Sequence, residues 1–152
     1  MFERFTSTGL EIVEAHCDAP CGVYDPSQAR VEAESVLQLT KKITDLKMPD
    51  GGDQAASTAY QNTLTRFIAI KEERAELAKH HLLVLWTDYF KPQHLEKYPE
   101  LHDLFWKSAK LCSSVKQEVS LEHAQELMDN VKRVHEIFWE TKGKDVPWYT
   151  AS

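Results

Sequence analysis

A long segment without glycine or proline is the feature that most constrains the fold of this 152-residue chain. Neither residue occurs between Gly52 and Pro92, and apolar side chains recur within that segment at spacings of three and four, as on one face of a helix. They are Leu64, Phe67, Ile68, Ala75, Ala78, Leu82, Leu85, Trp86 and Tyr89. Asp53 or Ser57 can accept hydrogen bonds from the first amide groups of a helix. The pattern predicts one long helix that ends before Pro92.

Three further helices follow from the same reasoning. Asp25–Pro26 is a helix start, since aspartate suits the N-cap and proline the first helical position, and this helix should stop near Lys47. Pro99 opens a third helix, and Ser120 caps a fourth that Gly143 ends. Each helix has an apolar stripe and short connections join them. We therefore expect an all-α fold, an antiparallel four-helix bundle, with an irregular segment ahead of it.

Composition limits the partners and the compartment. A net charge of -6 without any block of lysine or arginine argues against nucleic acid and anionic membranes as partners. No apolar run approaches the roughly 20 residues of a membrane-spanning helix. Three cysteines do not form a secreted disulfide framework. We expect a cytoplasmic protein whose partners are small molecules or further copies of the chain.

Two cysteines near the start lie outside any helical pattern. Cys17 and Cys21 are four apart, beside the imidazole of His16, and Pro20 and Gly22 shape the backbone between and after them. Thiolates are soft ligands that suit transition metals, so the segment is a candidate metal hook. A local disulfide and half of a structural zinc site are the alternatives, although a disulfide suits a reducing compartment poorly and zinc needs further ligands.

The remaining cysteine and a missing motif narrow the metal chemistry. Cys112 lies on the predicted third helix, where a small buried apolar role is commoner than metal binding. No Glu-x-x-His pair occurs in the chain, which counts against a di-iron carboxylate bundle. The histidines from His80 to His135 are expected on helix surfaces or interfaces rather than as ligands.

The whole N-terminal run has a specific likeness. It reads His16-Cys17-Asp18-Ala19-Pro20-Cys21-Gly22-Val23-Tyr24-Asp25-Pro26. This run closely resembles the hook of the nickel superoxide dismutases. The likeness continues through Gln28–Val36, Ile70–His81, Leu85–Pro92, Glu96–His102 and Ile137–Lys142. It departs at Ala19, where the family is expected to carry a larger aliphatic residue, and in a longer connection between the first two helices.

The resemblance implies a processed precursor. Residues 1–15 would be a leader that a peptidase removes after Ala15, residues 16–24 the nickel-binding hook, and residues 25–152 the bundle. The family is a homohexamer of four-helix bundles, which agrees with the fold expected from the helical pattern. In the uncleaved chain the His16 amine is a peptide nitrogen, so the ligand set that the family uses would be incomplete.

The resemblance also implies the cofactor and the reaction. One nickel ion per subunit would be held by the His16 amine, the Cys17 backbone nitrogen and the thiolates of Cys17 and Cys21, with the His16 imidazole as an axial ligand in the oxidised state. Nitrogen and thiolate donors suit square-planar nickel(II), and an axial nitrogen helps a higher valence. The implied activity is superoxide dismutation, which yields dioxygen and hydrogen peroxide by Ni(II)/Ni(III) cycling.

Five further residues acquire roles only from the resemblance. Asp18, Tyr24 and Tyr89 would surround the substrate channel, where Tyr24 acts as a gate or an indirect proton donor because an unperturbed tyrosine is a poor acid at neutral pH. Glu32 and Arg74 would orient the metal-bound histidine. From the residues alone, Glu32 is an ordinary first-turn acid and Arg74 belongs to a solvated charge run.

Two hypotheses compete with a nickel enzyme. A metal-delivery protein could hold copper or nickel in the same hook without turnover, because copper binds nitrogen and sulfur sites more tightly. A helical assembly protein could carry a hook that has lost function, which the retention of His16, both hook cysteines and Tyr24 opposes.

Local lysines, Lys79 and Lys91, are hypotheses for guiding an anionic substrate toward an acidic protein.

Overall fold

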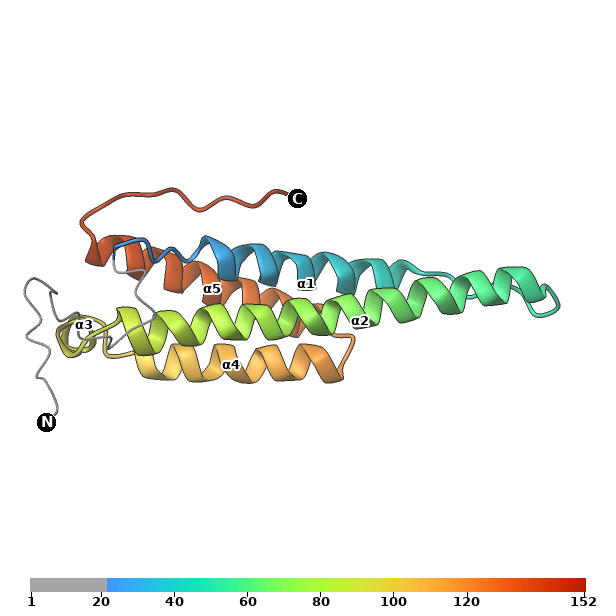
Figure 1. Cartoon of the computed structure of the whole chain (residues 1–152), viewed down its shortest axis with the longest axis horizontal. Helices are drawn as coiled ribbons and strands as arrows, with labels where there is room; N and C mark the ends of the chain where they lie inside the picture. Colours follow the sequence, from blue (N-terminus) through green and yellow to red (C-terminus); the bar gives the residue numbers. More distant parts are fainter. Residues whose placement is uncertain (1–21) are drawn as a thin grey trace, which may run out of the picture.

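The computed structural model describes residues 22–152 and shows a bundle of long helices (Figure 1). The elements are α1 (Ser27–Asp45), α2 (Gln54–Val84), a π-helical turn η1 (Leu85–Tyr89), α3 (Pro92–Lys97), α4 (Leu101–Gln117) and α5 (Leu121–Thr141). Each long helix packs against two others, α1 against α2 and α5, and α4 against α2 and α5. The expected all-α bundle is confirmed.

The sequence signals at the helix ends account for most of the boundaries. The Asp25 carboxylate accepts a 2.7 Å hydrogen bond from the Ser27 amide, and the Asp53 carboxylate accepts from Ala55 and Ala56 at 2.9 and 3.0 Å. Ser120 likewise caps α5 through the amide of His123. Short polar side chains at these positions satisfy amides that have no intrahelical acceptor.

Two departures from the expected helices lie near Pro92. The long helix does not simply stop there, because its last turn is π-helical, with the Phe90 amide donating to the Leu85 carbonyl. Pro92 then opens the short helix α3, which the sequence analysis missed. A proline is compatible with the first turn of a helix as well as with an end, and the pattern favoured the end.

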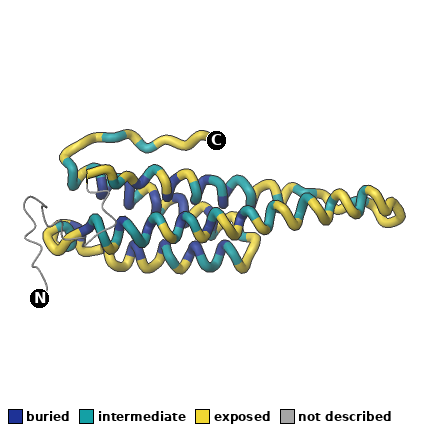
Figure 2. Tube along the Cα trace, in the orientation of Figure 1, coloured by how far each residue is buried: buried dark blue, intermediate teal, exposed yellow. Residues whose placement is uncertain are grey.

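The core occupies only one part of the bundle. Its fully buried side chains come from all four long helices and include Val36, Leu82, Phe105, Leu127 and Phe138. No residue between Lys41 and Ile70 is buried, and Figure 2 shows this end of α1 and α2 as an exposed arm that extends past α4 and α5. The arm carries the long connection between the first two helices.

One charged residue is part of the interior. Lys71 is 1% exposed, and its ammonium donates to the carbonyls of Val115, Lys116 and Glu118 at the end of α4. Lys71 begins the charge run Lys71–Glu76, to which Arg74 also belongs, and a solvated helix face was expected for this run; that expectation is wrong for Lys71. None of the helices in the described part of the chain is both long and apolar enough to cross a membrane.

Candidate metal centre

The predicted metal ligands precede the described residues. His16, Cys17, Asp18 and Cys21 all lie outside them. Within residues 22–152, no group of three or more histidine, cysteine, aspartate or glutamate side chains is arranged to hold a metal ion. Cys112 is fully buried in α4, and burial raises the pKa of its thiol to about 12. A protonated, enclosed thiol is not a metal ligand, so the candidate donors remain those of the N-terminal segment.

The first described residues lead from that segment to an aromatic contact. Gly22, directly after Cys21, has a φ of 94°, a backbone conformation that side chains other than glycine rarely adopt. Two residues later, the Tyr24 ring meets the Tyr89 ring edge-on, with centroids 6.0 Å apart. The structure thus brings together two residues that are 65 positions apart in the sequence and that were both predicted to lie near the metal.

Contacts from the end of α5 fix Tyr89. Its hydroxyl shares a 2.6 Å hydrogen bond with the Thr141 hydroxyl at the end of α5, and its ring packs 4.4 Å from that of Phe138. The Lys142 ammonium lies 5.5 Å from the Tyr89 ring centroid. The π-helical turn places Tyr89 at the junction of α2 and α5, in keeping with the frequent occurrence of such turns at functional sites.

A cavity of about 290 Å³ adjoins the hook at this point. Its walls include Gly22, Tyr24, Tyr89, Lys91 and His94. The His94 Nδ1 accepts a hydrogen bond from the Lys91 amide at 3.1 Å, and its ring stacks on Tyr89 with centroids 5.8 Å apart. Burial, followed by the charge of Lys91, lowers the pKa of His94. His94 is therefore a neutral wall of the cavity at neutral pH, with its proton on Nε2.

A second cavity, of about 370 Å³, is also lined by Tyr24. Tyr24, Gln28 and His81 are among its lining residues. Burial and the neighbouring His80 lower the pKa of His81, and the charge of Glu32 opposes this shift. The imidazole therefore stays neutral at neutral pH, and the surroundings of Tyr24 carry no fixed positive charge from this side chain.

Glu32 and Arg74 form an ion pair between α1 and α2. Their closest nitrogen and oxygen atoms are 3.3 Å apart, and the Glu32 side chain is only 12% exposed. Arg74 also reaches the exposed carboxylate of Glu73, at 3.8 Å. The Arg74 side chain is 35% exposed, so it keeps part of the solvated character expected of its charge run, but it also joins two helices through a largely enclosed carboxylate.

The two candidate steering lysines lie in different surroundings. Lys91 lines the cavity beside Tyr89. Lys79 instead points toward α4, where its ammonium is 3.4 Å from the Ser113 hydroxyl. Thr141 and Lys142 also contact Tyr89, although neither was predicted as a site residue. No spacing rule links the end of the last helix to Tyr89.

The donor set suits a late first-row transition metal. Two thiolates with nitrogen donors are soft ligands and favour nickel or copper over hard cations. The described residues around the end of the hook supply a glycine turn, two tyrosines and a cavity open to a small molecule. A transition metal held by such donors could exchange electrons with a small molecule that enters this cavity.

Comparisons with known proteins agree on one family. A family model described as nickel-containing superoxide dismutase matches residues 11–142. The nickel superoxide dismutases of Streptomyces coelicolor and Streptomyces seoulensis are 49% and 48% identical to this chain over 130 residues, which are 86% of this chain and 90% of each relative. A native nickel superoxide dismutase structure is similar with a TM-score of 0.71 and 48% identity, covering 85% of this chain and 100% of that one.

Proposed function

The chain belongs to the nickel-containing superoxide dismutases, and we propose that His16, Cys17 and Cys21 hold its nickel ion, one per subunit. The protein is an oxidoreductase that disproportionates superoxide into dioxygen and hydrogen peroxide, with nickel as its cofactor. The observation that carries the site assignment is the contact of Tyr24 with Tyr89 beside a cavity that reaches Gly22. Family membership also favours the enzyme over the metal-delivery and assembly hypotheses.

The donors of the hook fit this cofactor. The amine of His16, the backbone nitrogen of Cys17, the thiolates of Cys17 and Cys21 and the His16 imidazole would hold the ion, and nitrogen donors combined with thiolates suit nickel. When bound there, nickel supplies a one-electron change of valence. The amine becomes a ligand only after cleavage between Ala15 and His16, so residues 1–15 act as a leader and residues 16–24 as the hook ahead of the bundle.

Asp18, Tyr24 and Tyr89 are the residues that would surround the access path of superoxide to the metal. The Tyr24 and Tyr89 rings meet beside the cavity that Gly22 also lines, where they would leave room for a diatomic anion and hinder larger oxidants. Peroxide formation consumes two protons, and a tyrosine hydroxyl orders the water that delivers them more readily than it ionises at neutral pH. Lys91 on the cavity wall and Lys142 over the Tyr89 ring add positive charge near this path.

Glu32 and Arg74 act on the hook histidine. A metal-bound imidazole is oriented by a carboxylate that accepts from its other ring nitrogen. Glu32 is the enclosed carboxylate of this region, and Arg74 holds it from α2 at 3.3 Å. This pair would therefore orient the His16 imidazole toward the metal.

Replacing Glu32 by glutamine tests this assignment. Glu32→Gln keeps the size of the side chain but removes the charge, so we expect nickel content to remain near one per chain while the superoxide turnover falls about 10- to 100-fold. Glu73→Gln is the matched control, because Glu73 faces the same arginine from an exposed position. Equal turnover in the two variants would rule out a role for Glu32 at the hook.

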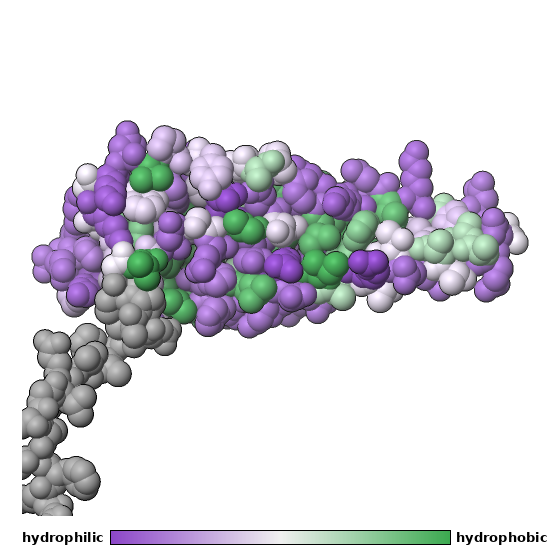
Figure 3. All heavy atoms as spheres, turned by 45° about the horizontal axis from the view of Figure 1, so that its top comes forward, coloured by the Kyte–Doolittle hydropathy of each residue, from purple (hydrophilic) through white to green (hydrophobic). Residues whose placement is uncertain are grey.

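The assembly and the compartment complete the proposal. The protein forms a homohexamer in the cytoplasm, after a peptidase has removed residues 1–15, and binds neither nucleic acid nor membranes. Exposed large apolar side chains support subunit contacts; Val31, Trp106, Val119 and Leu121 are examples. Figure 3 shows hydrophobic patches along one side of the bundle, separated by hydrophilic residues.

A further inference from the structure

The segment after α5 folds back over the bundle. Gly143, with a φ of 64°, follows the end of α5, and residues 144–152 then run alongside α1 and α5 in extended form (Figure 1). This segment lies beyond the match to the family model, which ends at residue 142. Its contacts are therefore a property of this chain that the family match does not describe.

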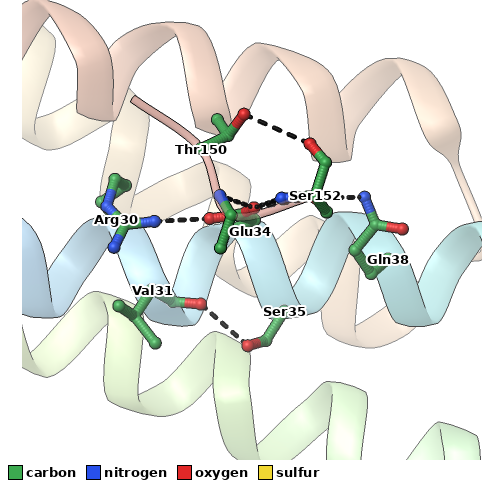
Figure 4. A network of polar contacts seen from close by, with 8 residues as sticks. Arg30, Val31, Glu34, Ser35, Gln38, Thr150 and Ser152 are labelled. Atoms are coloured by element: carbon green, nitrogen blue, oxygen red, sulfur yellow. Dashed lines mark hydrogen bonds and ion pairs between the residues drawn. The ribbon is translucent and has the colours of Figure 1, made fainter. Parts of the chain in front are cut away.

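A buried carboxylate receives the end of this segment. Glu34 on α1 is 6% exposed, and one of its oxygens accepts hydrogen bonds from the Ala151 amide at 2.7 Å, the Ser152 amide at 2.8 Å and the Ser152 hydroxyl at 2.7 Å (Figure 4). The other oxygen pairs with Arg30 at 2.5 Å. Hydrogen bonds to an ionised acceptor are among the strongest in proteins. Glu34 therefore binds two consecutive backbone amides of the segment strongly.

Three residues of α1 that are spaced by four contact the segment together. The Arg30 guanidinium lies 4.5 Å from the centroid of the Tyr149 ring. Glu34 binds the two amides, and the Gln38 amide donates to the Ser152 hydroxyl at 2.8 Å. Residues i, i+4 and i+8 share one face of a helix, so the segment contacts two successive turns on the same face of α1.

The other side of the segment is anchored on α5. The His135 ring is 2.8 Å from the Val146 carbonyl through Nε2, and it meets the Trp148 ring edge-on at 5.4 Å. Trp148 itself packs against the hydrophobic core. His135 was expected on a helix surface or an interface, but it is 6% exposed because this segment covers it. The segment thus joins α5 to α1.

The face of α1 that contacts this segment lies next to Glu32 and Arg74, the pair proposed to orient the hook histidine. Glu32 lies between Arg30 and Glu34 in the sequence, and it pairs with Arg74 of α2. Arg74 and Ser152 line the same groove, of about 370 Å³, together with Arg30 and Glu34. Any motion of this turn of α1 would therefore displace the Glu32 carboxylate relative to Arg74.

We infer that residues 144–152 form a clasp, held by Glu34, that fixes the first half of α1 and keeps Glu32 opposite Arg74. The importance of this for the metal rests on the proposed function, whereas the clasp itself does not. The segment acts as a positioning element that spans the chain from its last residues to the helix that follows the hook.

Hydrogen exchange of the full-length chain tests the clasp without using activity. Glu34→Gln keeps the shape of the side chain but loses the charge and turns an amide donor toward either Arg30 or the clasp. We expect amide exchange to rise about tenfold or more both in residues 149–152 and in the first half of α1. Glu126→Gln, an exposed carboxylate on α5, is the matched control and should change neither.

A second variant removes the opposite anchor. Trp148→Ala should raise exchange in the same two segments, because it frees the clasp from α5 while Glu34 is intact. Unprotected Ala151 and Ser152 amides in the unmodified protein would overturn the clasp. Faster exchange in the clasp alone, with α1 unchanged in both variants, would overturn its effect on Glu32. Neither result depends on nickel or turnover, so a failure of the clasp is distinguishable from a failure of the proposed function.

Discussion

Replacing either hook cysteine by serine is expected to abolish both nickel binding and superoxide turnover. A serine hydroxyl is a hard oxygen donor that stays protonated at neutral pH, so Cys17→Ser or Cys21→Ser removes one of the two thiolates that suit nickel. We expect less than about 0.1 nickel per chain after loading, with superoxide consumption at the level of a metal-free control. Metal analysis of the purified protein and a superoxide-consumption assay measure the two effects.

Cys112→Ser is the matched control for this experiment. The Cys112 side chain is fully buried in α4 and its thiol has a pKa of about 12, so it contributes no thiolate at neutral pH. Prepared, like the hook variants, as a chain that begins at His16, the variant should bind nickel and turn over superoxide like the same chain with Cys112 intact, with only some loss of stability. A Cys17 or Cys21 variant that still carried one nickel per chain would remove that residue from the ligand set.

Replacing Lys71 by methionine is expected to lower the free energy of unfolding. The loss should be the largest among the substitutions that we propose in the described bundle. Lys71 donates to three carbonyls near the end of α4, where the helix leaves acceptors without intrahelical partners and where its dipole favours a positive charge. Lys71→Met keeps the apolar stem but leaves one buried and two partly buried carbonyls without their donor. We expect the free energy of unfolding to fall by about 2–4 kcal/mol.

Urea unfolding measures this loss. The midpoint should decrease while the denaturant dependence stays the same, since the surface exposed on unfolding is unchanged. Lys132→Met, at an exposed position of α5, is the control and should change the free energy of unfolding by less than about 0.5 kcal/mol. If both variants lost the same stability, the contacts of Lys71 with α4 would not explain it.

The bundle was predictable because its signals are local. Asp53, Ser120 and Gly143 mark helix ends through their own hydrogen-bonding and backbone preferences, and the apolar stripes identify the faces that pack. The π-helical turn and α3 were missed because periodicity cannot distinguish a proline that ends one helix from a proline that starts the next. Such choices depend on the tertiary packing of residues around Tyr89.

The site was predictable only in part. The hook residues were identified from their types and from the family resemblance, and their role as ligands stays a prediction. The ion pair of Glu32 with Arg74 was invisible to spacing, since the two residues lie on different helices. Lys71 and His135 are more buried than expected, because sequence patterns treat charged and polar residues as exposed. Lys71 is buried against carbonyls at the end of α4, and residues 144–152 cover His135.

Cleavage before His16 offers the most direct test of the account. A chain that begins at His16 is to be compared with the full chain from Met1, both loaded with nickel under the same conditions and assayed for nickel content and superoxide consumption. We expect the shorter protein to bind one nickel per chain and to consume superoxide rapidly. The full chain should do neither, because only cleavage frees the His16 amine. A shorter chain that held nickel but consumed no superoxide would contradict the account.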